Sequence, residues 1–312
     1  MNNSLRIIGN IKNNQILKDE TGKYILKPKV RNSVENVYSY LLSRDFKYLP
    51  RLVDKQNINY EDHYLYEYIK EIPTPKEQKL KDLVITLADL HQKTSFYREI
   101  DLDEFKLTYE NINRELDYLN NYYHEIFTSI ENKVFMSPSE YLLIRNANII
   151  LNSIEYSKKH IQEWYQMIEG NRRQRQSMIH NNVHLSHFLK GDNYYLISWD
   201  HSMISIPILD LYQLYRNHYL DYDFLSKLKL YEDHFPLEKE EKTLLFTLIS
   251  IPEKITWDNN HYLMTIKVRK FLDYLQKTKD LKKAYYSKDQ EDHDTVLNKD
   301  EKDINPKRQE NS

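Results

Sequence analysis

The sequence predicts an α+β fold with two lobes, a small β-rich one followed by a larger, mainly helical one. Residues 5–29 alternate short apolar runs with turns, and Asp19-Glu20-Thr21-Gly22 is a hairpin signal. Pro73 and Pro75 then interrupt the pattern. Most of the chain after them shows the apolar period of amphipathic helices, which indicates that the second lobe is helical.

The same periodicity predicts where the elements lie. In the small lobe we expect a helix over about 34–42 and strands over 51–53 and 64–69. In the large lobe the expected helices lie at about 80–91, 105–132, 138–169, 207–219, 223–231, 238–250 and 261–277. The end of the chain is highly charged and poor in apolar residues, which predicts disorder. The expected divisions are 1–69 for the small lobe, 70–277 for the large lobe and 278–312 for the tail.

Composition argues against several classes of protein. The 312 residues carry 45 Lys and Arg against 47 Asp and Glu, so no strong attraction to nucleic acid or anionic membranes is expected. The absence of cysteine excludes disulfides and thiolate chemistry. Only 4 glycines occur, which leaves little for a Gly-rich phosphate loop. There is no signal-peptide core and no apolar run long enough to span a bilayer, so we expect a cytoplasmic protein without a membrane span.

The most informative stretch surrounds a tight turn at Lys190–Asn193. Two short apolar arms, Phe188-Leu189 and Tyr194–Ile197, flank this turn and predict a β-hairpin. The polar segment His180–His187 precedes the first arm, and Ser198-Trp199-Asp200 follows the second. A hairpin brings these two ends side by side, so we expect both polar segments to face one pocket, as in an active site.

A small β-rich lobe, a proline-marked link and a helical lobe with an inserted hairpin match the bilobal protein kinase-like fold. Over roughly residues 5–275 the chain resembles the aminoglycoside phosphotransferase and choline kinase superfamily, with its closest likeness to the bacterial spore-coat kinase-like branch. The segments that carry the resemblance are, in order, Tyr24–Lys27, Tyr66–Ile69, Leu87–Thr94, His180–His187, Ile197–Asp200 and Pro207–Leu211.

The resemblance implies a nucleotide site that uses ATP and Mg²⁺. It makes Lys27 the lysine that contacts the nucleotide phosphates, with Lys29 as the off-register alternative, and Glu35 its ion-pair partner. Glu67 and Tyr68 fall where the hinge between the lobes would contact the nucleotide.

The departures from the family pattern concern the acids. The family's catalytic loop reads His-x-Asp, with an Asn five residues after the Asp. In this chain the loop carries His180, then Asn182 at the Asp position and His187 at the Asn position. The metal-binding segment has Ser198 where the family has Asp, and only the second acid, Asp200, remains. An amide is no useful general base, and a serine and an imidazole are poor ligands for Mg²⁺. The implied catalytic residues are therefore degenerate, and metal binding by Asp200 and Ser198 is expected to be weak.

Three hypotheses follow. The leading one is a catalytically impaired, kinase-like protein with a binding or scaffolding role, whose partner is a nucleotide, an unknown small molecule or a protein. The second is an active ATP-dependent phosphotransferase that uses Asp200 for its metal. The third is a metal site formed by loop histidines, although the segment lacks the Glu of a metallohydrolase motif. The histidines concerned are His180, His184, His187 and His201.

Purely structural roles compete with some of these assignments. Charged residues near strand ends are often solvated, so Lys27 and Glu35 could form a surface pair. Asp210 is expected to brace the catalytic loop, and His91 to be a buried, hydrogen-bonded histidine. The basic run at 172–175 is expected to be a solvated connection.

Overall fold

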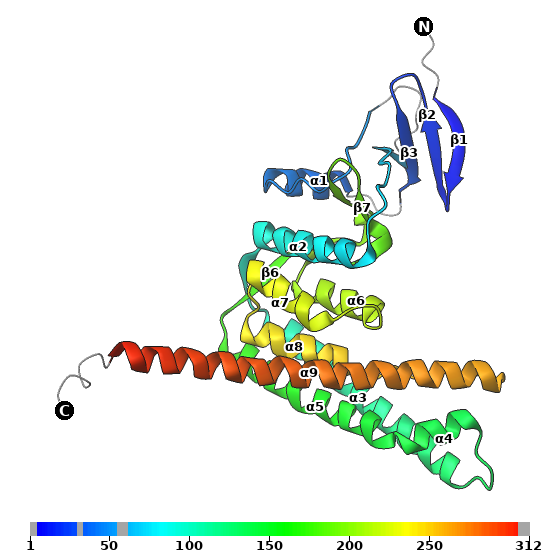
Figure 1. Ribbon diagram of the computed structural model, residues 1–312, viewed down its shortest axis with the longest axis vertical. Helices are drawn as coiled ribbons and strands as arrows, with labels where there is room; N and C mark the ends of the chain where they lie inside the picture. The colour runs from blue at the N-terminus through cyan, green and yellow to red at the C-terminus, as the bar shows by residue number, and fades with distance from the viewer. Residues whose placement is uncertain (1–4, 30–33, 55–61, 305–312) are drawn as a thin grey trace. The chain divides into compact units, whose positions relative to one another are not determined.

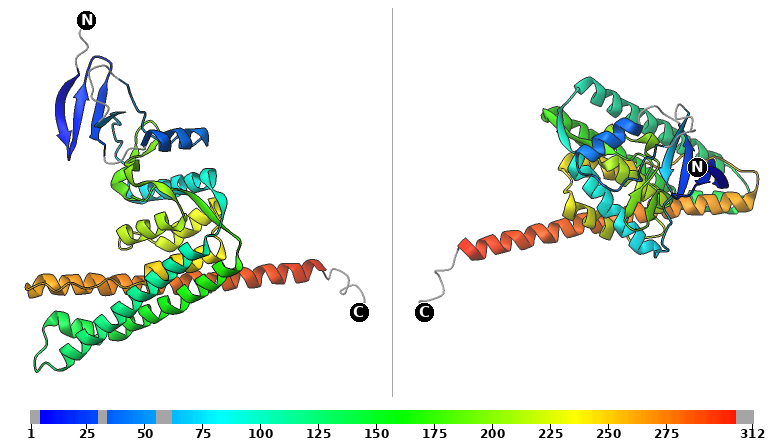
Figure 2. Two further views of the ribbon diagram at one scale, coloured as in Figure 1. Left: turned by 180° about the vertical axis from the view of Figure 1, so that it is seen from behind. Right: turned by 90° about the horizontal axis from the view of Figure 1, so that it is seen from above.

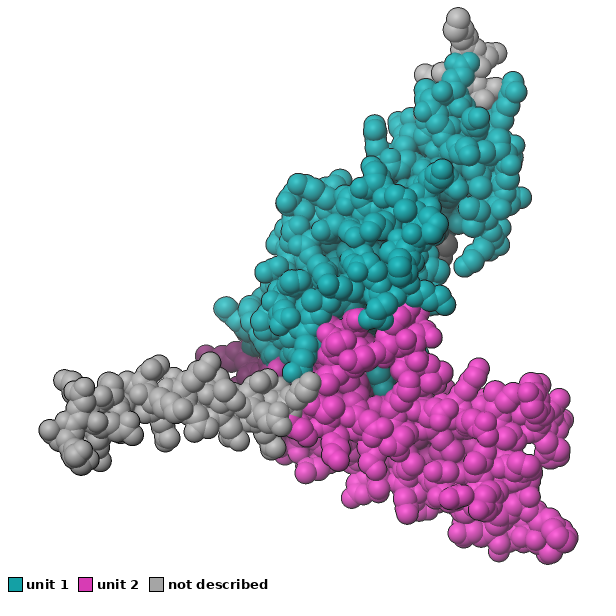
Figure 3. Space-filling view, viewed as in Figure 1, with its two compact units in different colours: residues 1–99, 173–217, 229–238 teal, residues 100–172, 218–228, 239–312 magenta. Residues whose placement is uncertain are grey.

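The computed structural model describes residues 5–29, 34–54 and 62–304, with side chains described up to residue 287. The chain forms two compact units (Figure 3). The first unit comprises residues 1–99, 173–217 and 229–238, and the second comprises 100–172, 218–228 and 239–312. Both units are therefore built from segments that are distant in sequence. Within the described residues, no helix is long and apolar enough to cross a membrane.

The first unit begins with a four-stranded antiparallel sheet in the order β1-β2-β3-β4 (Figure 1). The strands are β1 (Arg6–Ile11), β2 (Asn14–Lys18), β3 (Lys23–Pro28) and β4 (His63–Glu67). Asp19 forms the turn between β2 and β3, because its carboxylate accepts the backbone N–H groups of Thr21 and Gly22. This confirms the predicted hairpin. Of the strand expected at 51–53, only an isolated bridge between Leu52 and Tyr66 forms.

The remaining elements of the first unit surround the loop that carries the polar segments. They are α1 (Val34–Ser43), α2 (Lys76–Thr94), β5 (Phe96–Glu99), β6 (Arg173–Ile179), β7 (Phe188–Lys190), β8 (Tyr194–Leu196), β9 (Met203–Ser205) and most of α6 (Ile208–His218). Helix α7 (Phe224–His234) is divided between the units at residue 228. Strands β7 and β8 pair antiparallel, with Phe188 opposite Leu196, as the sequence predicts.

The sheet β5-β6-β9 is an element that the sequence analysis missed. Its central strand β6 is too polar, RQRQSMI, to show an apolar period. Arg173 and Arg175 lie on this strand and not in a solvated connection. The guanidinium of Arg175 packs 4.0 Å from the ring centroid of Phe235 and donates a hydrogen bond to the carbonyl of Pro236. Because β6 ends at Ile179, it delivers the chain directly to the predicted catalytic loop.

The second unit is helical. It contains α3 (Leu102–Glu131), α4 (Pro138–Arg145), α5 (Ala147–Gly170), α8 (Lys239–Ser250) and α9 (His261–Ile304). Asp101 caps α3, and Ser137 and Glu140 form a capping box at the start of α4. The single helix expected over 138–169 is divided at Asn146, whose side chain donates to the carbonyl of Leu142.

Helix α5 is the centre of the packing in this unit. It lies beside α3 (Figures 1 and 2) and also contacts α8. Its residues Ile150 and Trp164 are fully buried, as is Tyr123 of α3. Small residues let α5 and α8 approach closely, since Ser153 donates to the carbonyl of Ser250 at 2.7 Å.

Helix α9 continues beyond the point where the sequence analysis placed a disordered tail. Leu281 and Tyr285 are buried, with exposed fractions of 8% and 1%. Lys282 donates to the hydroxyl of Ser250 and lies 3.4 Å from the ring centroid of Tyr156. The stretch 278–287 therefore differs from the expectation, because a few apolar residues at helical spacing pack in spite of a charged local composition. The lobe boundary expected at residue 69 stays a prediction.

We expect the substitution Tyr285→Ala to lower the free energy of unfolding by about 3 kcal/mol, because it leaves a cavity in the packed core. The neighbouring Tyr286 is 39% exposed, so Tyr286→Ala should have a clearly smaller effect. Chemical denaturation of the two variants tests this. Equal effects would show that this part of α9 is not packed in solution.

Candidate active site

The loop that follows β6 is held in place by Asp210, in the first turn of α6. One Asp210 carboxylate oxygen accepts the backbone N–H of His180 and the other accepts that of Asn181, both at 2.8 Å. Asp210 is completely buried. A buried carboxylate must be hydrogen-bonded, and here both of its oxygens are used to fix the loop. Asp210 is thus the expected brace.

His91 of α2 completes this anchor. Its Nε2 lies 3.1 Å from Asp210 Oδ2, and its Nδ1 lies 2.6 Å from the hydroxyl of Tyr231. The carboxylate can only accept, so Nε2 donates to it and Nδ1 accepts from the tyrosine. The expectation of a buried, hydrogen-bonded His91 is therefore met.

His180 is also structural. It is completely buried, its Nε2 donates to the carbonyl of Ile197 at 2.8 Å, and its ring meets that of Trp199 edge-on. Burial lowers the pKa of His180 to about 4, in spite of the nearby charge of Asp210. The imidazole is therefore neutral at physiological pH and ties the loop to the end of the hairpin.

Asn182 and His187 are linked through the backbone. The Nδ1 of His187 donates to the main-chain carbonyl of Asn182 at 2.9 Å. The side-chain amide of Asn182 is half-buried and makes no hydrogen bond to the residues that the structure describes. Partial burial lowers the pKa of His187, and its cationic neighbours Lys12 and Lys27 lower it further. Together with the neutral His180, all three predicted loop positions thus offer only neutral groups.

Lys27 and Asp200 lie together, a pairing that the sequence analysis did not predict. The Lys27 ammonium of β3 forms an ion pair with Asp200 Oδ2, and both side chains are largely buried. Asp200 Oδ1 is buried and has no hydrogen-bond partner among the described residues. Ser198 lies nearby in sequence with a left-handed backbone, φ 69°. Such a conformation is uncommon for serine and turns the chain into the short helix that carries Asp200.

Glu35 does not pair with Lys27. It accepts from the ammonium of Lys29 at 3.3 Å and from the hydroxyl of Tyr64 at 2.7 Å. Burial would raise the pKa of Glu35, but the hydrogen bonds from Tyr64 and Lys29 outweigh it and lower the pKa. Lys29 therefore pairs with Glu35, and Lys27 pairs with Asp200.

Glu67 and Tyr68, the predicted hinge residues, are tied into the sheet at the end of β4. The Glu67 carboxylate accepts the backbone N–H of Arg51, and the Tyr68 N–H donates to the carbonyl of Lys23. The N–H group of Glu67 donates to the carbonyl of Arg51. The backbone N–H groups of both predicted hinge residues are therefore already used.

An aromatic cluster that was not predicted from the sequence lies beside the ion pair. The rings of Tyr38 and Tyr64 each lie about 6 Å from that of Tyr66. Burial raises the pKa of Tyr66, and the charge of Asp200 raises it further, so its hydroxyl stays protonated. The alternation Tyr64-Leu65-Tyr66 was the signal that could have revealed it, since it places both tyrosines on one face of β4.

This donor set offers Mg²⁺ only a weak site. Mg²⁺ requires near-octahedral oxygen ligands and is held by one or two carboxylates. Only Asp200 provides a carboxylate, and one of its two oxygens is already paired with Lys27. Ser198 adds a neutral hydroxyl and His187 a nitrogen. One open carboxylate oxygen is the least that Mg²⁺ sites in proteins provide, so the hold on the ion is weak.

The histidines do not form a metal cluster either. No group of three or more His, Cys, Asp or Glu side chains that could hold a metal occurs among the described residues. His180 is bonded to Ile197, His187 to Asn182, and the Nδ1 of His184 to the hydroxyl of Ser186. These contacts account for three of the four histidines of the zinc hypothesis.

Solved structures share this architecture. The aminoglycoside phosphotransferase from Alicyclobacillus acidocaldarius superposes with a TM-score of 0.64 over 93% of each chain, at 15% identity. The chain has the aminoglycoside phosphotransferase fold. A spectinomycin phosphotransferase in complex with ADP and spectinomycin covers 88% of this chain and 92% of its own, with a TM-score of 0.48 and 14% identity. A choline/ethanolamine kinase family protein from Mesorhizobium loti covers 90% of this chain and 88% of its own, with a TM-score of 0.41 and 12% identity.

The aminoglycoside phosphotransferase fold confirms the α+β, kinase-like architecture predicted from the sequence. No family model and no curated protein matches the chain. The likeness to the spore-coat branch stays a prediction, as do the roles of the individual site residues.

We expect Asp210→Ala to lower the free energy of unfolding by roughly 3 kcal/mol, because it leaves the N–H groups of His180 and Asn181 and the ring of the buried His91 without an acceptor. Asp117, which is 66% exposed and pairs with Lys158, provides the control. Its change to Ala should lower stability by less than about 1 kcal/mol. Urea denaturation measures both, and similar losses would contradict the anchoring role of Asp210.

The pKa of His180 predicts a loss of stability on acidification. In the unfolded chain this imidazole takes up a proton near its ordinary pKa of 6.5, whereas the folded chain resists protonation until about pH 4. Stability is therefore fully present above pH 6.5 and falls as the pH drops toward 4, by about 3 kcal/mol at most.

Unfolding free energies measured between pH 4.5 and 7.5 test this. The His180→Gln chain should be less stable overall but should show a shallower pH slope. A matched change at the exposed His124 should leave the slope as in the unaltered chain. An unchanged slope in His180→Gln would show that His180 is not the group that titrates.

Proposed function

We propose that the chain is a catalytically impaired member of the kinase-like fold with a binding or scaffolding role. The observation that carries this proposal is the state of the candidate active site. The loop anchored by Asp210 and the β7–β8 hairpin are both present, and we call them the frame of the site. The acidic groups that phosphoryl transfer needs are replaced or neutralised.

The first missing group is the base. Phosphoryl transfer in this fold uses an Asp that accepts the proton of the acceptor hydroxyl. Asn182 stands at that position, and its amide carries no charge and has no useful basicity. His180 is a poor replacement, because its ring is completely buried and burial lowers its pKa to about 4, which makes the imidazole a weak base.

The second missing group is the metal site. In active enzymes of this kind, Mg²⁺ orients the transferred phosphoryl group and neutralises its charge. Lys27 already compensates Asp200, and neither Ser198 nor His187 supplies a second carboxylate. Lys27 remains the residue that would contact the phosphates of a bound ATP or ADP. To do so, its ammonium would have to leave the ion pair with Asp200.

The intact frame supports a role in binding. Asp210, His91 and His180 maintain the loop conformation through buried hydrogen bonds. Such a network would serve a protein that presents a defined surface or holds a ligand without turning it over. The partner would be a nucleotide, a small molecule or another protein.

One observation favours a second candidate, an active ATP-dependent phosphotransferase. Asp200 Oδ1 is buried without a partner among the described residues, and an oxygen in that state is available to a cation. In this alternative Asp200 holds the metal, and Asn182 orients the acceptor hydroxyl.

Phosphate release and transfer from γ-labelled ATP with Mg²⁺ separates the two. We expect the unaltered chain to show the same background rate as Asp200→Ala, because neither positions a metal. Turnover that requires Mg²⁺ and is abolished by Asp200→Ala would overturn the proposal.

The double substitution Asn182→Asp with Ser198→Asp returns the acids to the frame. If the frame is otherwise competent, this chain should hydrolyse ATP measurably above the unaltered chain. Thermal unfolding of both chains is the control for folding. If the double variant is folded and gains no hydrolysis, the claim that the frame itself remains competent is wrong.

A further inference from the structure

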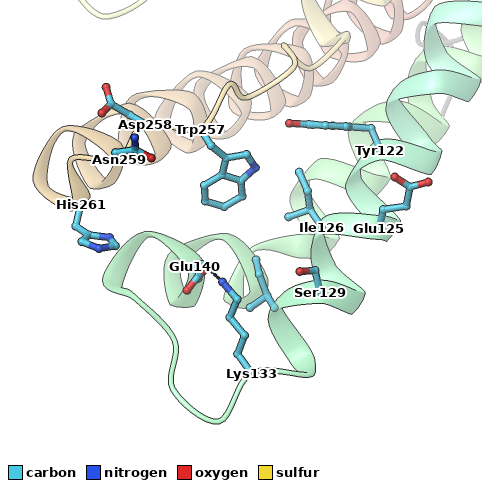
Figure 4. A pocket seen from close by; sticks show the side chains of 11 residues that line it. Tyr122, Glu125, Ile126, Ser129, Lys133, Glu140, Trp257, Asp258, Asn259 and His261 are labelled. Carbon is cyan, nitrogen blue, oxygen red and sulfur yellow. Dashed lines mark hydrogen bonds and ion pairs between the residues drawn. The ribbon is translucent and has the colours of Figure 1, made fainter.

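A hollow lies in the helical unit, among residues that do not belong to the unit carrying Lys27 and Asp200 (Figure 4). Its volume is about 530 Å³, within the range of ligand pockets in proteins. It is formed by the end of α3, the start of α4 and the segment that enters α9. Its lining residues are Tyr122, Glu125, Ile126, Ser129, Ile130, Lys133, Glu140, Trp257, Asp258, Asn259 and His261.

Aromatic rings form part of the wall. Trp257 is 46% exposed, unlike the other two tryptophans of the chain, Trp164 and Trp199, which are buried. Its indole lies across the hollow from Ile126 and near Tyr122 (Figure 4). The ring of Tyr122 already contacts a cation, because Lys254 Nζ lies 4.9 Å from its centroid.

Carboxylates outnumber cations around the hollow. Glu140 is neutralised by an ion pair with Lys133, drawn as a dashed line in Figure 4. Glu125 and Asp258 form no ion pair with any described residue. One Asp258 oxygen accepts the N–H of Asn260, which orients the side chain and leaves its charge uncompensated. The pocket is therefore suited to a positively charged group.

Apolar residues continue from the lining. Lys133 is followed by Val134 and Phe135, which are 89% and 87% exposed. His261 is followed by Tyr262 and Leu263, which are 73% and 50% exposed. Exposed apolar side chains that adjoin the lining residues in sequence are typical of an interaction surface that is larger than the pocket itself.

We propose that this surface docks a partner protein segment in which an arginine is flanked by apolar residues. A guanidinium is planar, stacks on an indole and donates several hydrogen bonds, so it matches Trp257 together with the carboxylates of Glu125 and Asp258. The flanking apolar residues would cover Phe135 and Tyr262. A membrane fits less well, because the two uncompensated carboxylates repel anionic lipid headgroups.

The docking surface would serve the proposed binding role, and its existence does not depend on the absence of phosphotransfer. A chain that proved to be an active kinase could still dock its partner here. If no peptide bound to this surface, the turnover of the unaltered chain and of Asp200→Ala would still test the proposed function.

The test uses a random dodecapeptide library displayed on phage and panned against the full chain. We expect the selected sequences to be enriched in arginine with apolar neighbours. A selected peptide, made synthetically, should change the fluorescence of Trp257, the only tryptophan that is not buried. Replacing its arginine with citrulline should weaken binding about tenfold or more.

Two variants remove the proposed contacts with little risk to folding, since all three side chains are exposed. The charge variant is Glu125→Gln with Asp258→Asn, which keeps an oxygen acceptor for Asn260, and the aromatic variant is Trp257→Ala. Each should weaken the selected peptide about tenfold, measured by calorimetry. Leu107→Ala, an exposed change on the same helix α3, should have no effect.

The proposal is overturned if panning yields no enrichment over the Trp257→Ala chain, or if the selected peptides lack a basic residue. It is also overturned if the charge variant binds them as tightly as the unaltered chain. Binding of phosphatidylglycerol vesicles that Phe135→Ser abolishes, with no selected peptide, would assign the surface to lipid instead.

Discussion

The anchoring of one loop by Asp210 is the interaction on which the candidate site depends. This buried carboxylate fixes two consecutive backbone N–H groups, and His91 fixes the carboxylate in turn. Asn182 and His187 follow this anchor along the loop, and the bond from His180 to Ile197 links the anchor to the segment with Ser198 and Asp200. The loop conformation is therefore set by buried hydrogen bonds that do not involve the groups which would carry out chemistry. Those groups can be lost without loss of the frame.

The charges of the site are consistent with a loop whose conformation does not depend on the groups that would carry out chemistry. Lys27 and Asp200 neutralise each other, while Glu35 is held by Lys29 and Tyr64. The neutral groups of Asn182, Ser198 and His187 occupy the remaining positions. A site without a second carboxylate has no strong hold on Mg²⁺. This favours the proposed role in binding over a role in phosphoryl transfer, which needs the metal.

Local signals in the sequence were sufficient for the fold and for the hairpin between the two polar segments. The turn at Asp19, the hairpin arms around Lys190 and the helical periods all have short-range causes. The strand β6 could not be predicted, because its polar residues are stabilised by contacts such as that of Arg175 with Phe235, which is distant in sequence. The partner of Glu35 was equally hidden, since the choice between Lys27 and Lys29 depends on where Asp200 lies. The packed stretch of α9 around Tyr285 was obscured by its charged neighbours.

Metal binding tests the central claim most directly, because the account rests on a site that lacks the charge to hold a divalent ion. Mn²⁺ can stand in for Mg²⁺, and its free and bound forms are distinguished by electron paramagnetic resonance. In a titration with ADP present, we expect the unaltered chain to bind Mn²⁺ no more tightly than Asp200→Ala. Stoichiometric, tight binding by the unaltered chain that Asp200→Ala removes would contradict the account.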